Sequence, residues 1–306
     1  MWSRQLLQGK WVGGDLIFVT GQKENIIPLL KEYHLEKIVR ALSCIKEHPY
    51  SREKQKECIL TLYQGKTEKS VFRGMIIPTL RKMGLILGYE TFIRISANGS
   101  IAVESKKISE LLHQRTLQVL ILDLDRKKFR FVDEMINVGF DKFTSEDDFK
   151  KMLAAKIVSP SYKQSIERVN HWLRILEQVG LLKENSIGEL SLDVQVYEQA
   201  NNDLSLTGAK ITEFEKYLIE SYQELRSKIS VIIDIADLRE RVAIKLLNNH
   251  KEILTESQFD ERLREILVTN NKYIISLGRP MGAEEKLFLF KGKYYRTLTI
   301  KLAGGR

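Results

Sequence analysis

The stretch 70–86, SVFRGMIIPTLRKMGLI, places apolar residues at helical spacing and then stops at a glycine. Its apolar side chains recur every three or four positions, at Phe72, Ile76, Leu80 and Met83. This period predicts an amphipathic helix with one buried face. Gly84 follows at once, and glycine adopts the left-handed conformation that ends a helix at no steric cost. We therefore predict a helix over 70–83, bent at Pro78, that leads directly into a strand.

Two helical patterns precede this stretch and a strand pattern follows it. Residues 35–48 and 51–64 both have the 3.6-residue period of an amphipathic helix. After the glycine, apolar and polar residues alternate on either side of Asn98-Gly99, a dipeptide typical of a two-residue hairpin turn. Three helices followed by a hairpin is the order of a winged helix, whose third helix enters the DNA major groove. A further helix is expected around 107–126, as a link to the next unit.

The same pattern returns later in the chain. When Gly84 is aligned with Gly180, the apolar positions of 165–182 coincide with those of the first helix, and two aliphatic residues follow each glycine. The next residues, LLKENSIGELSL, predict a hairpin. Upstream, 144–156 predicts a preceding helix, and Ser159-Pro160 is typical of an N-cap followed by the first helical residue. These features predict a second winged helix.

The last third of the chain has the same order of elements. Helices are expected at 211–228, 234–249 and 257–268. The strand pattern YIISLGR follows them, and then a hairpin whose tight turn is Lys291-Gly292. The last helix of this unit has no basic front end, unlike that of the first unit. The predicted fold class is mainly α with small β-hairpins (α+β), built of tandem winged-helix (helix-turn-helix) units.

These patterns divide the chain into an N-terminal arm and three units. The arm covers 1–22, which is alternatively a strand with turns. The first winged helix, with its linking helix, covers 23–140, and the second covers 141–205. The third unit covers 206–306 and is either separate from the second or merged with it.

Charge is concentrated in the front part of the chain. The 306 residues carry a formal net charge of +9. Residues 1–140 contain 23 Lys and Arg against 15 Asp and Glu, a net of +8, and the remaining residues have a net of +1. This difference favours a negatively charged partner on the first part of the chain.

Candidate DNA contacts lie at the front of the two repeated helices, on the first wing and on the arm. Arg73 is the strongest, because an arginine fork matches the O6 and N7 acceptors of guanine. The alternative is that these charged residues form solvated helix surfaces. His171, beside Trp172, is expected to be structural. The full set of expected DNA-binding residues is Ser3, Arg4, Gln5, Gln8, Lys10, Lys66, Lys69, Ser70, Arg73, Arg94, Asn98, Tyr162, Lys163, Gln164 and Arg168.

No residue pattern favours catalysis in this chain. Glu104-Ser105-Lys106, with Glu90 upstream, fits half of a metal-dependent nuclease signature, but it lies where the wing is expected to end. Asp123 and Asp125 are expected to be a solvated cluster at the end of the linking helix. P-loop, GxSxG and HExxH motifs do not occur. We therefore expect neither catalytic residues nor a cofactor in this chain.

The cysteines and the apolar runs bear on the compartment. Cys44 and Cys58 belong to no CxxC pair, and we expect them to be small buried apolar residues rather than metal ligands. No apolar run approaches the ~20 residues of a membrane helix. The start of the chain lacks the apolar core of a secretion signal. These features predict a cytoplasmic protein with no membrane partner.

Tandem winged helices with a polar, basic arm resemble the DNA-recognition part of type IIS restriction endonucleases. The resemblance covers the architecture of most of the chain and rests on FRGMIIPTLRKMGLI, VNHWLRILEQVGLL and the hairpins that follow them. It implies that a monomer recognises a short asymmetric site on double-stranded DNA. It also implies that Mg²⁺-dependent cleavage belongs to a separate domain absent from this chain. The alternatives are a dimeric transcriptional or replication regulator, a protein-interaction scaffold and an autonomous nuclease.

Overall fold

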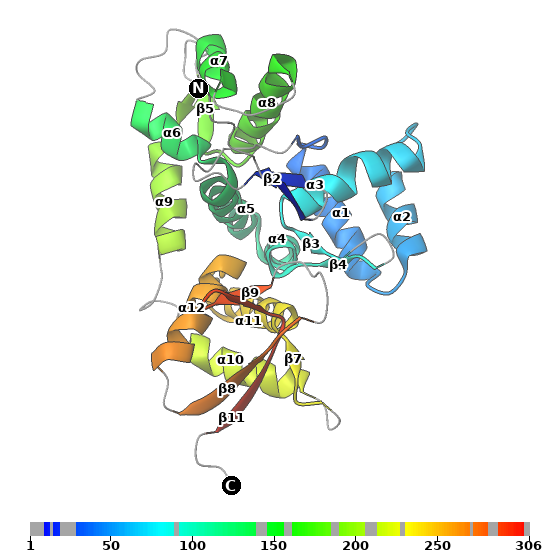
Figure 1. The fold of residues 1–306 in the computed structure, drawn as a ribbon. Coiled ribbons are helices and arrows are strands. Elements are labelled where there is room, and N and C mark those ends of the chain that lie inside the picture. Colours follow the sequence, from blue (N-terminus) through cyan, green and yellow to red (C-terminus); the bar gives the residue numbers. More distant parts are fainter. Residues whose placement is uncertain are drawn as a thin grey trace, which may run out of the picture.

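The computed structural model of the chain describes residues 9–12, 15–18, 29–88, 92–138, 146–155, 161–184, 190–205, 213–226, 230–269, 272–280 and 287–302. These residues are mainly helical, with small antiparallel sheets (Figure 1). The predicted α+β class is therefore confirmed. The predicted boundaries after residues 22 and 140 lie outside the described residues. Within the predicted arm, β1 (Gly9–Val12) pairs antiparallel with β2 (Asp15–Phe18).

The first group of elements follows the predicted order of helices and strands. It comprises α1 (Leu35–Glu47), α2 (Arg52–Thr61), the π-helical η1 (Lys69–Ile76), α3 (Ile77–Lys82), β3 (Ile86–Leu87) and β4 (Arg94–Ile95). The hydrogen-bond pattern changes from π to α next to Pro78, which has no N–H to donate. Gly84 has a φ of 69°, which confirms the predicted left-handed helix end.

The predicted turn at Asn98-Gly99 is wrong. Both residues lie in the first turn of α4 (Ala97–Ile108), where the Ser96 side chain caps the helix and accepts a hydrogen bond from the Gly99 N–H at 3.1 Å. A Cβ at Gly99 would lie 2.2 Å from the carbonyl oxygen of Leu85. This glycine is therefore required by the close approach of two backbones and not by a hairpin turn. The strands that do pair are the short β3 and β4.

The linking helix expected around 107–126 is confirmed, and it is separate from α4, which replaces the second strand of the expected hairpin. A break at Ser109, whose backbone is extended, separates α4 from α5 (Glu110–Leu124). The Ser109 hydroxyl accepts a hydrogen bond from the Leu112 N–H at 3.1 Å and so caps α5. In Figure 1, α5 lies in the centre of the molecule, between the first group of elements and the helices α6 and α9.

The second group contains the predicted repeat. It comprises the π-helical η2 (Asp125–Phe129), α6 (Phe131–Val138), α7 (Glu146–Ala155), α8 (Tyr162–Gln178), β5 (Leu182–Glu184), β6 (Leu190–Leu192) and α9 (Val194–Ser205). Ser161 caps α8, whereas the predicted cap at Ser159-Pro160 lies outside the described residues. Gly180 has a φ of 74°, which is positive like that of Gly84. Both repeated helices therefore end at a glycine in the left-handed conformation.

The third group combines three helices with a three-stranded sheet. It comprises α10 (Phe214–Leu225), β7 (Ile233–Asp234), α11 (Ile235–His250), α12 (Glu256–Thr269), β8 (Tyr273–Gly278), β9 (Phe288–Phe290), β10 (Lys293–Tyr295) and β11 (Thr297–Leu302). The strand order is β7–β11–β8, and β9 pairs with β10. Lys291 and Gly292 both have positive φ, which confirms the predicted tight turn.

One hydrophobic core runs through all three groups. It extends along the chain from Leu30 to Ile300, and Trp172 of α8 is among its fully buried side chains. The apolar face predicted for 70–83 is buried in it, as are the corresponding positions of α8. Because the groups share this core, each of them depends on the others for the burial of its apolar surface. Among the described helices, none has the length and apolar character needed to span a membrane.

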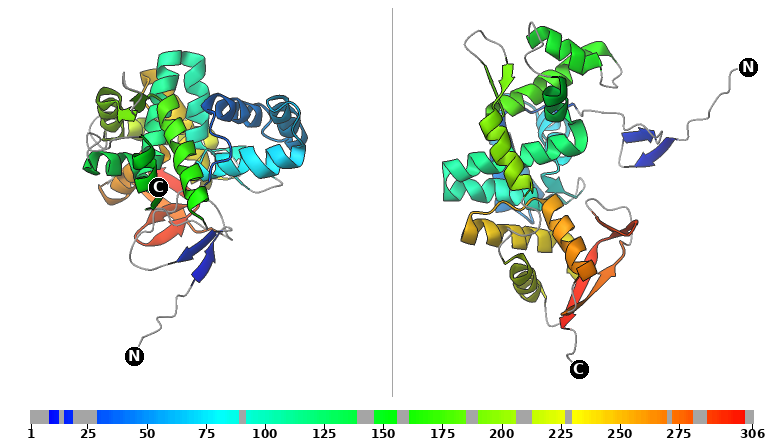
Figure 2. Two further views of the ribbon diagram at one scale, coloured as in Figure 1. Left: turned by 90° about the horizontal axis from the view of Figure 1, so that it is seen from above. Right: turned by 90° about the vertical axis from the view of Figure 1, so that its left-hand side faces the viewer.

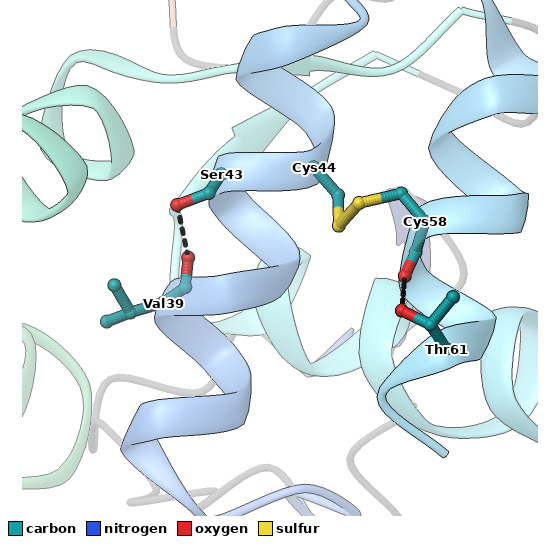
Figure 3. The surroundings of a disulfide bond; sticks show 5 residues. All are labelled: Val39, Ser43, Cys44, Cys58 and Thr61. Carbon is teal, nitrogen blue, oxygen red and sulfur yellow. Dashed lines mark hydrogen bonds between the residues drawn. A yellow bond between two sulfur atoms is a disulfide. The ribbon is translucent and has the colours of Figure 1, made fainter. Parts of the chain in front are cut away.

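Cys44 and Cys58 form a disulfide bond, contrary to the expectation of two unlinked apolar residues. The bond joins α1 to α2 across a Cα–Cα distance of 5.7 Å (Figure 3). The neighbouring hydroxyls bond within their own helices: Ser43 Oγ donates to Val39 O and Thr61 Oγ1 donates to Cys58 O. Sequence spacing alone cannot pair two cysteines on different helices, because the pairing depends on how the helices pack.

Reduction of this disulfide is expected to lower the free energy of unfolding. The bond closes a loop with a sequence separation of 14, and a loop of this size is worth roughly 3 kcal/mol in the chain-entropy model. Denaturant unfolding with and without dithiothreitol measures the difference. The Cys44→Ala, Cys58→Ala double variant is the control, since its stability must not respond to the reductant. Equal stability of the native chain in both conditions would contradict the prediction.

Candidate nucleic-acid interface

The segment 29–35, which we call the bridging strip, lies between the two repeated helices. On one side it bonds to α3. The ammonium group of Lys82 donates to the carbonyl oxygen of Leu29 at 3.2 Å, and the Glu32 N–H donates to Thr79 Oγ1 at 3.3 Å. These bonds fix the C-terminal half of the first repeated helix against the strip.

On its other side the bridging strip bonds to α8. His171 Nδ1–H donates to Leu30 O at 2.6 Å. The side chain of Gln178 accepts from the Leu35 N–H and donates to Tyr33 O, both at 2.9 Å. The two repeated helices are therefore held, near their C-terminal ends, by the same short run of backbone.

An aromatic and a cationic side chain complete this contact. The rings of Tyr33 and His171 stack with their centroids 4.6 Å apart. The guanidinium of Arg174 lies 5.1 Å from the centre of the Tyr33 ring and donates to its hydroxyl at 3.0 Å. His171 thus has the structural role that the sequence analysis expected, as a link between α8 and the bridging strip.

The first repeated helix exposes its predicted DNA-binding residues. Lys66, Lys69, Ser70 and Arg73 are all exposed, while Val71 and Phe72 beside them are buried. The nearby Glu68 pairs with Lys56 at 2.7 Å. Among the described residues, no carboxylate pairs with Lys69 or Arg73. The front of this helix therefore presents an unneutralised positive charge to the solvent.

The second repeated helix exposes its predicted DNA-binding residues to different degrees. Tyr162, which is 57% exposed, and Lys163 face the solvent, but Gln164 and Arg168 are only half exposed. The exposed side of α8 carries a surface hollow of about 290 Å³. Among the described residues, the hollow is lined by Lys163, Ile166, Glu167, Asn170, His171 and Arg174.

Asn170 and Arg174 are the residues of this hollow that the sequence analysis missed. They follow Lys163 at i+7 and i+11, so they lie on the helix face next to the predicted one. Helical spacing counted from Lys163 would have identified them. The carboxamide of asparagine has one donor and one acceptor, which match the N7 acceptor and the N6 donor of adenine in the major groove. Arginine offers the matching donors for guanine or phosphate.

Arg94 and Asn98, expected on an exposed wing, lie at the contact with the third group. Arg94 pairs with Asp237 and, at 3.6 Å, with Asp234. Asn98 Oδ1 accepts from the Glu256 N–H at 2.9 Å. The expected wing position followed from the turn at Asn98-Gly99, which the structure replaces with a helix start. These two side chains join the first and third groups.

The predicted DNA-binding residues of the arm fall almost entirely outside the described part of the chain. Ser3, Arg4, Gln5 and Gln8 lie outside the described residues, and of Lys10 only the position on β1 is described. Their assignment to DNA binding stays a prediction.

Glu104-Ser105-Lys106, which fits half of the nuclease signature, lies in α4, where structural contacts account for it. Glu104 accepts from Lys46 and from Lys107, both at 2.9 Å, and these contacts hold its pKa below the ordinary value despite the opposing effect of partial burial. Ser105 is buried, and Glu90 lies outside the described residues. Within the described part of the chain, no three His, Cys, Asp or Glu side chains gather as a metal-ligand group.

Asp125, expected to be solvated, is the most deeply buried carboxylate described here. Its oxygens accept from the Trp172 indole at 2.8 Å and from the N–H groups of Val132 at 2.9 Å and Phe131 at 3.3 Å. Burial raises the pKa of Asp125 to about 6, and these donors offset part of the increase. The carboxylate joins α5 and η2 to α6 and α8. Its neighbour Asp123 pairs with Lys127 at 2.7 Å.

Comparison of the chain with protein-family models, curated proteins and solved structures finds no significant match. Function must therefore be argued from the geometry of this molecule alone.

Asp125 is expected to make stability fall as the pH rises from about 4 to about 6. Its pKa is raised in the folded state, so the folded chain binds the proton more tightly than the unfolded chain, and this stabilisation is lost as the pH rises through about 6. A rise from 3.8 to about 6 corresponds to roughly 3 kcal/mol.

Denaturant unfolding of the native chain and of Asp125→Asn at several pH values isolates this contribution. The stability of the native chain minus that of the variant must decrease across this range. A difference that stays constant or grows with pH would show that Asp125 is not the titrating group.

Proposed function

We propose that this chain binds double-stranded DNA in a sequence-specific manner through tandem winged-helix units. The observation that carries the proposal is the exposed front of η1 and the residues just before it, where Lys66, Lys69, Ser70 and Arg73 face the solvent without described carboxylate partners while the opposite face of the helix lies in the core. A helix with this arrangement can enter a major groove and neutralise phosphates at the same time.

The order of the elements supports the winged-helix assignment. In the third group the chain runs α10, β7, α11, α12, β8, hairpin and β11, with the sheet order β7–β11–β8. We interpret this order as a three-helix unit with a strand between its first two helices and a wing after the third, and it supports the proposal. The first and second groups contain the shorter form, a helix that ends at a left-handed glycine and a two-stranded hairpin.

The bridging strip supports a single, continuous DNA site. Because the strip bonds to α3 and to α8, the two repeated helices have a fixed relative position. Two fixed helices in one chain read two neighbouring, different half-sites, so the expected site is short and asymmetric and the protein binds as a monomer. The resemblance to type IIS recognition parts assigns the cleavage step, and the Mg²⁺ it requires, to another domain.

Selection from a library of random duplexes tests the proposal. We expect one short asymmetric consensus, bound with an affinity that falls steeply as salt increases. Enrichment of a palindromic site by a dimer would indicate the regulator instead. Weak binding that is insensitive to salt would indicate a protein-interaction scaffold, and the absence of any sequence preference would rule out specific recognition.

Arg73→Ala is expected to relax the preference at one base position of the selected consensus. An arginine that donates two hydrogen bonds to guanine contributes roughly 1–3 kcal/mol of discrimination. Competition binding with duplexes substituted at each position measures the loss. Arg40→Ala is the matched control, since Arg40 is an exposed arginine of α1 that pairs with Glu36 at 2.7 Å. An equal effect of both variants would contradict the assignment.

A further inference from the structure

The front of α12 is occupied by contacts within the protein. Ser257 Oγ donates to Asp123 Oδ2 at 3.1 Å, and Gln258 Nε2 donates to the carbonyl oxygen of Asp203 at 2.7 Å. Gln258 is buried. In a winged helix the corresponding helix enters the groove by its first turns. In the third group those turns are covered, so a DNA contact of this group must use another element.

The third group separates its charges between helices and strands. Over the described residues 213–226 and 230–269, which contain the helices, there are 12 Asp and Glu against 8 Lys and Arg. Over the described residues 273–280 and 287–302, which contain β8 to β11, there is no acidic residue. The cations of these described residues are Arg279, Lys291, Lys293, Arg296 and Lys301, of which Arg296 pairs at 3.1 Å with Asp234 of β7 in the same sheet.

The β9–β10 hairpin presents two of these cations at its tip. Lys291 and Gly292 form the tight turn, with φ angles of 47° and 74°, and Lys293 is the first residue of β10. The ammonium group of Lys291 lies 5.3 Å from the centre of the Phe290 ring. Both lysines are exposed, and no described carboxylate pairs with either. Next to them, Tyr294 is 57% exposed.

The hairpin lies on the side of the molecule where the arm is found. In both views of Figure 2 the strands of the third group and the β1–β2 hairpin protrude on the same side of the helical body. In the left view the cyan helix η1–α3 also borders this side. In that view the strand side of the third group therefore lies on the same side of the molecule as η1 and the β1–β2 hairpin.

We propose that the β9–β10 hairpin binds the phosphate backbone of duplex DNA that flanks the recognised site. This inference rests on the proposed DNA binding and adds a contact to it. Lysines at the tip of a rigid turn supply point charges for phosphate, and Tyr294 supplies a hydroxyl and an aromatic surface for the sugar–phosphate chain. Such contacts carry no base preference, so the hairpin strengthens binding without changing the sequence that is read.

The test compares the double variant Lys291→Gln, Lys293→Gln with the native chain. The probes are a duplex of about 40 base pairs with the selected site at its centre and a short duplex that contains the site alone. On the long duplex we expect the slope of log affinity against log salt to decrease in magnitude by about 2, because two phosphate contacts are lost. On the short duplex, and in the selected consensus, we expect no change.

The matched control is Lys216→Gln, Lys251→Gln, which removes the same charge from exposed lysines on the helical side of the third group. An equal loss in the control would mean that net charge, and not the hairpin, is responsible. Unchanged binding of the long duplex by the hairpin variant would overturn the inference and leave this face for another partner. If the native chain binds neither duplex, the proposed function itself fails, and that outcome is distinguishable from the other two.

Discussion

The relative position of the two repeated helices depends on the bridging strip. Backbone groups of residues 29–35 form hydrogen bonds on one side with Thr79 and Lys82 of α3, and on the other side with His171 and Gln178 of α8. Each such bond has a net value of about 1 kcal/mol, so their sum is comparable with the margin by which folded domains are stable. These contacts therefore add a polar constraint on the mutual orientation of two helices that also share a core.

A second constraint on the position of α8 lies in the hydrophobic core. The carboxylate of Asp125 ends α5 and accepts hydrogen bonds from Trp172 in α8 and from the start of α6. Burying such a group is unfavourable unless its acceptor sites are used, so few other arrangements of these three helices satisfy it. The bridging strip and the carboxylate of Asp125 therefore both constrain the same helix, α8.

Elements with a clear local signal were predictable from the sequence. The helices at 35–48 and 51–64, the repeated ends at Gly84 and Gly180, and the turn at Lys291-Gly292 all appear in the structure, because each depends on side-chain period or on one backbone angle. Asn98-Gly99 failed because a capped helix start and a hairpin turn use the same residue types. A glycine needed for close backbone contact cannot be distinguished locally from one needed for a positive φ.

Features that require partners distant in the sequence were not predictable. Asp125 and Trp172 are 47 residues apart, and Arg94 meets Asp237 across 143 residues. No local pattern marks either pair. For the candidate interface, the exposed front of η1 followed from its amphipathic pattern, whereas the hollow on α8 includes Asn170 and Arg174, which lie on the helix face next to the predicted one.

The separation of charge in the third group has a consequence for the approach of any highly charged body. The net acidic helices on one side, and on the other the strands β8 to β11, whose described residues carry cations and no acidic side chain, give this part of the molecule a permanent electric dipole moment. In the field of a polyanion, such a dipole experiences a torque that turns the ribbon toward the negative charge before contact. A larger fraction of diffusional collisions then begins in one orientation, and this bias weakens as the Debye length shortens.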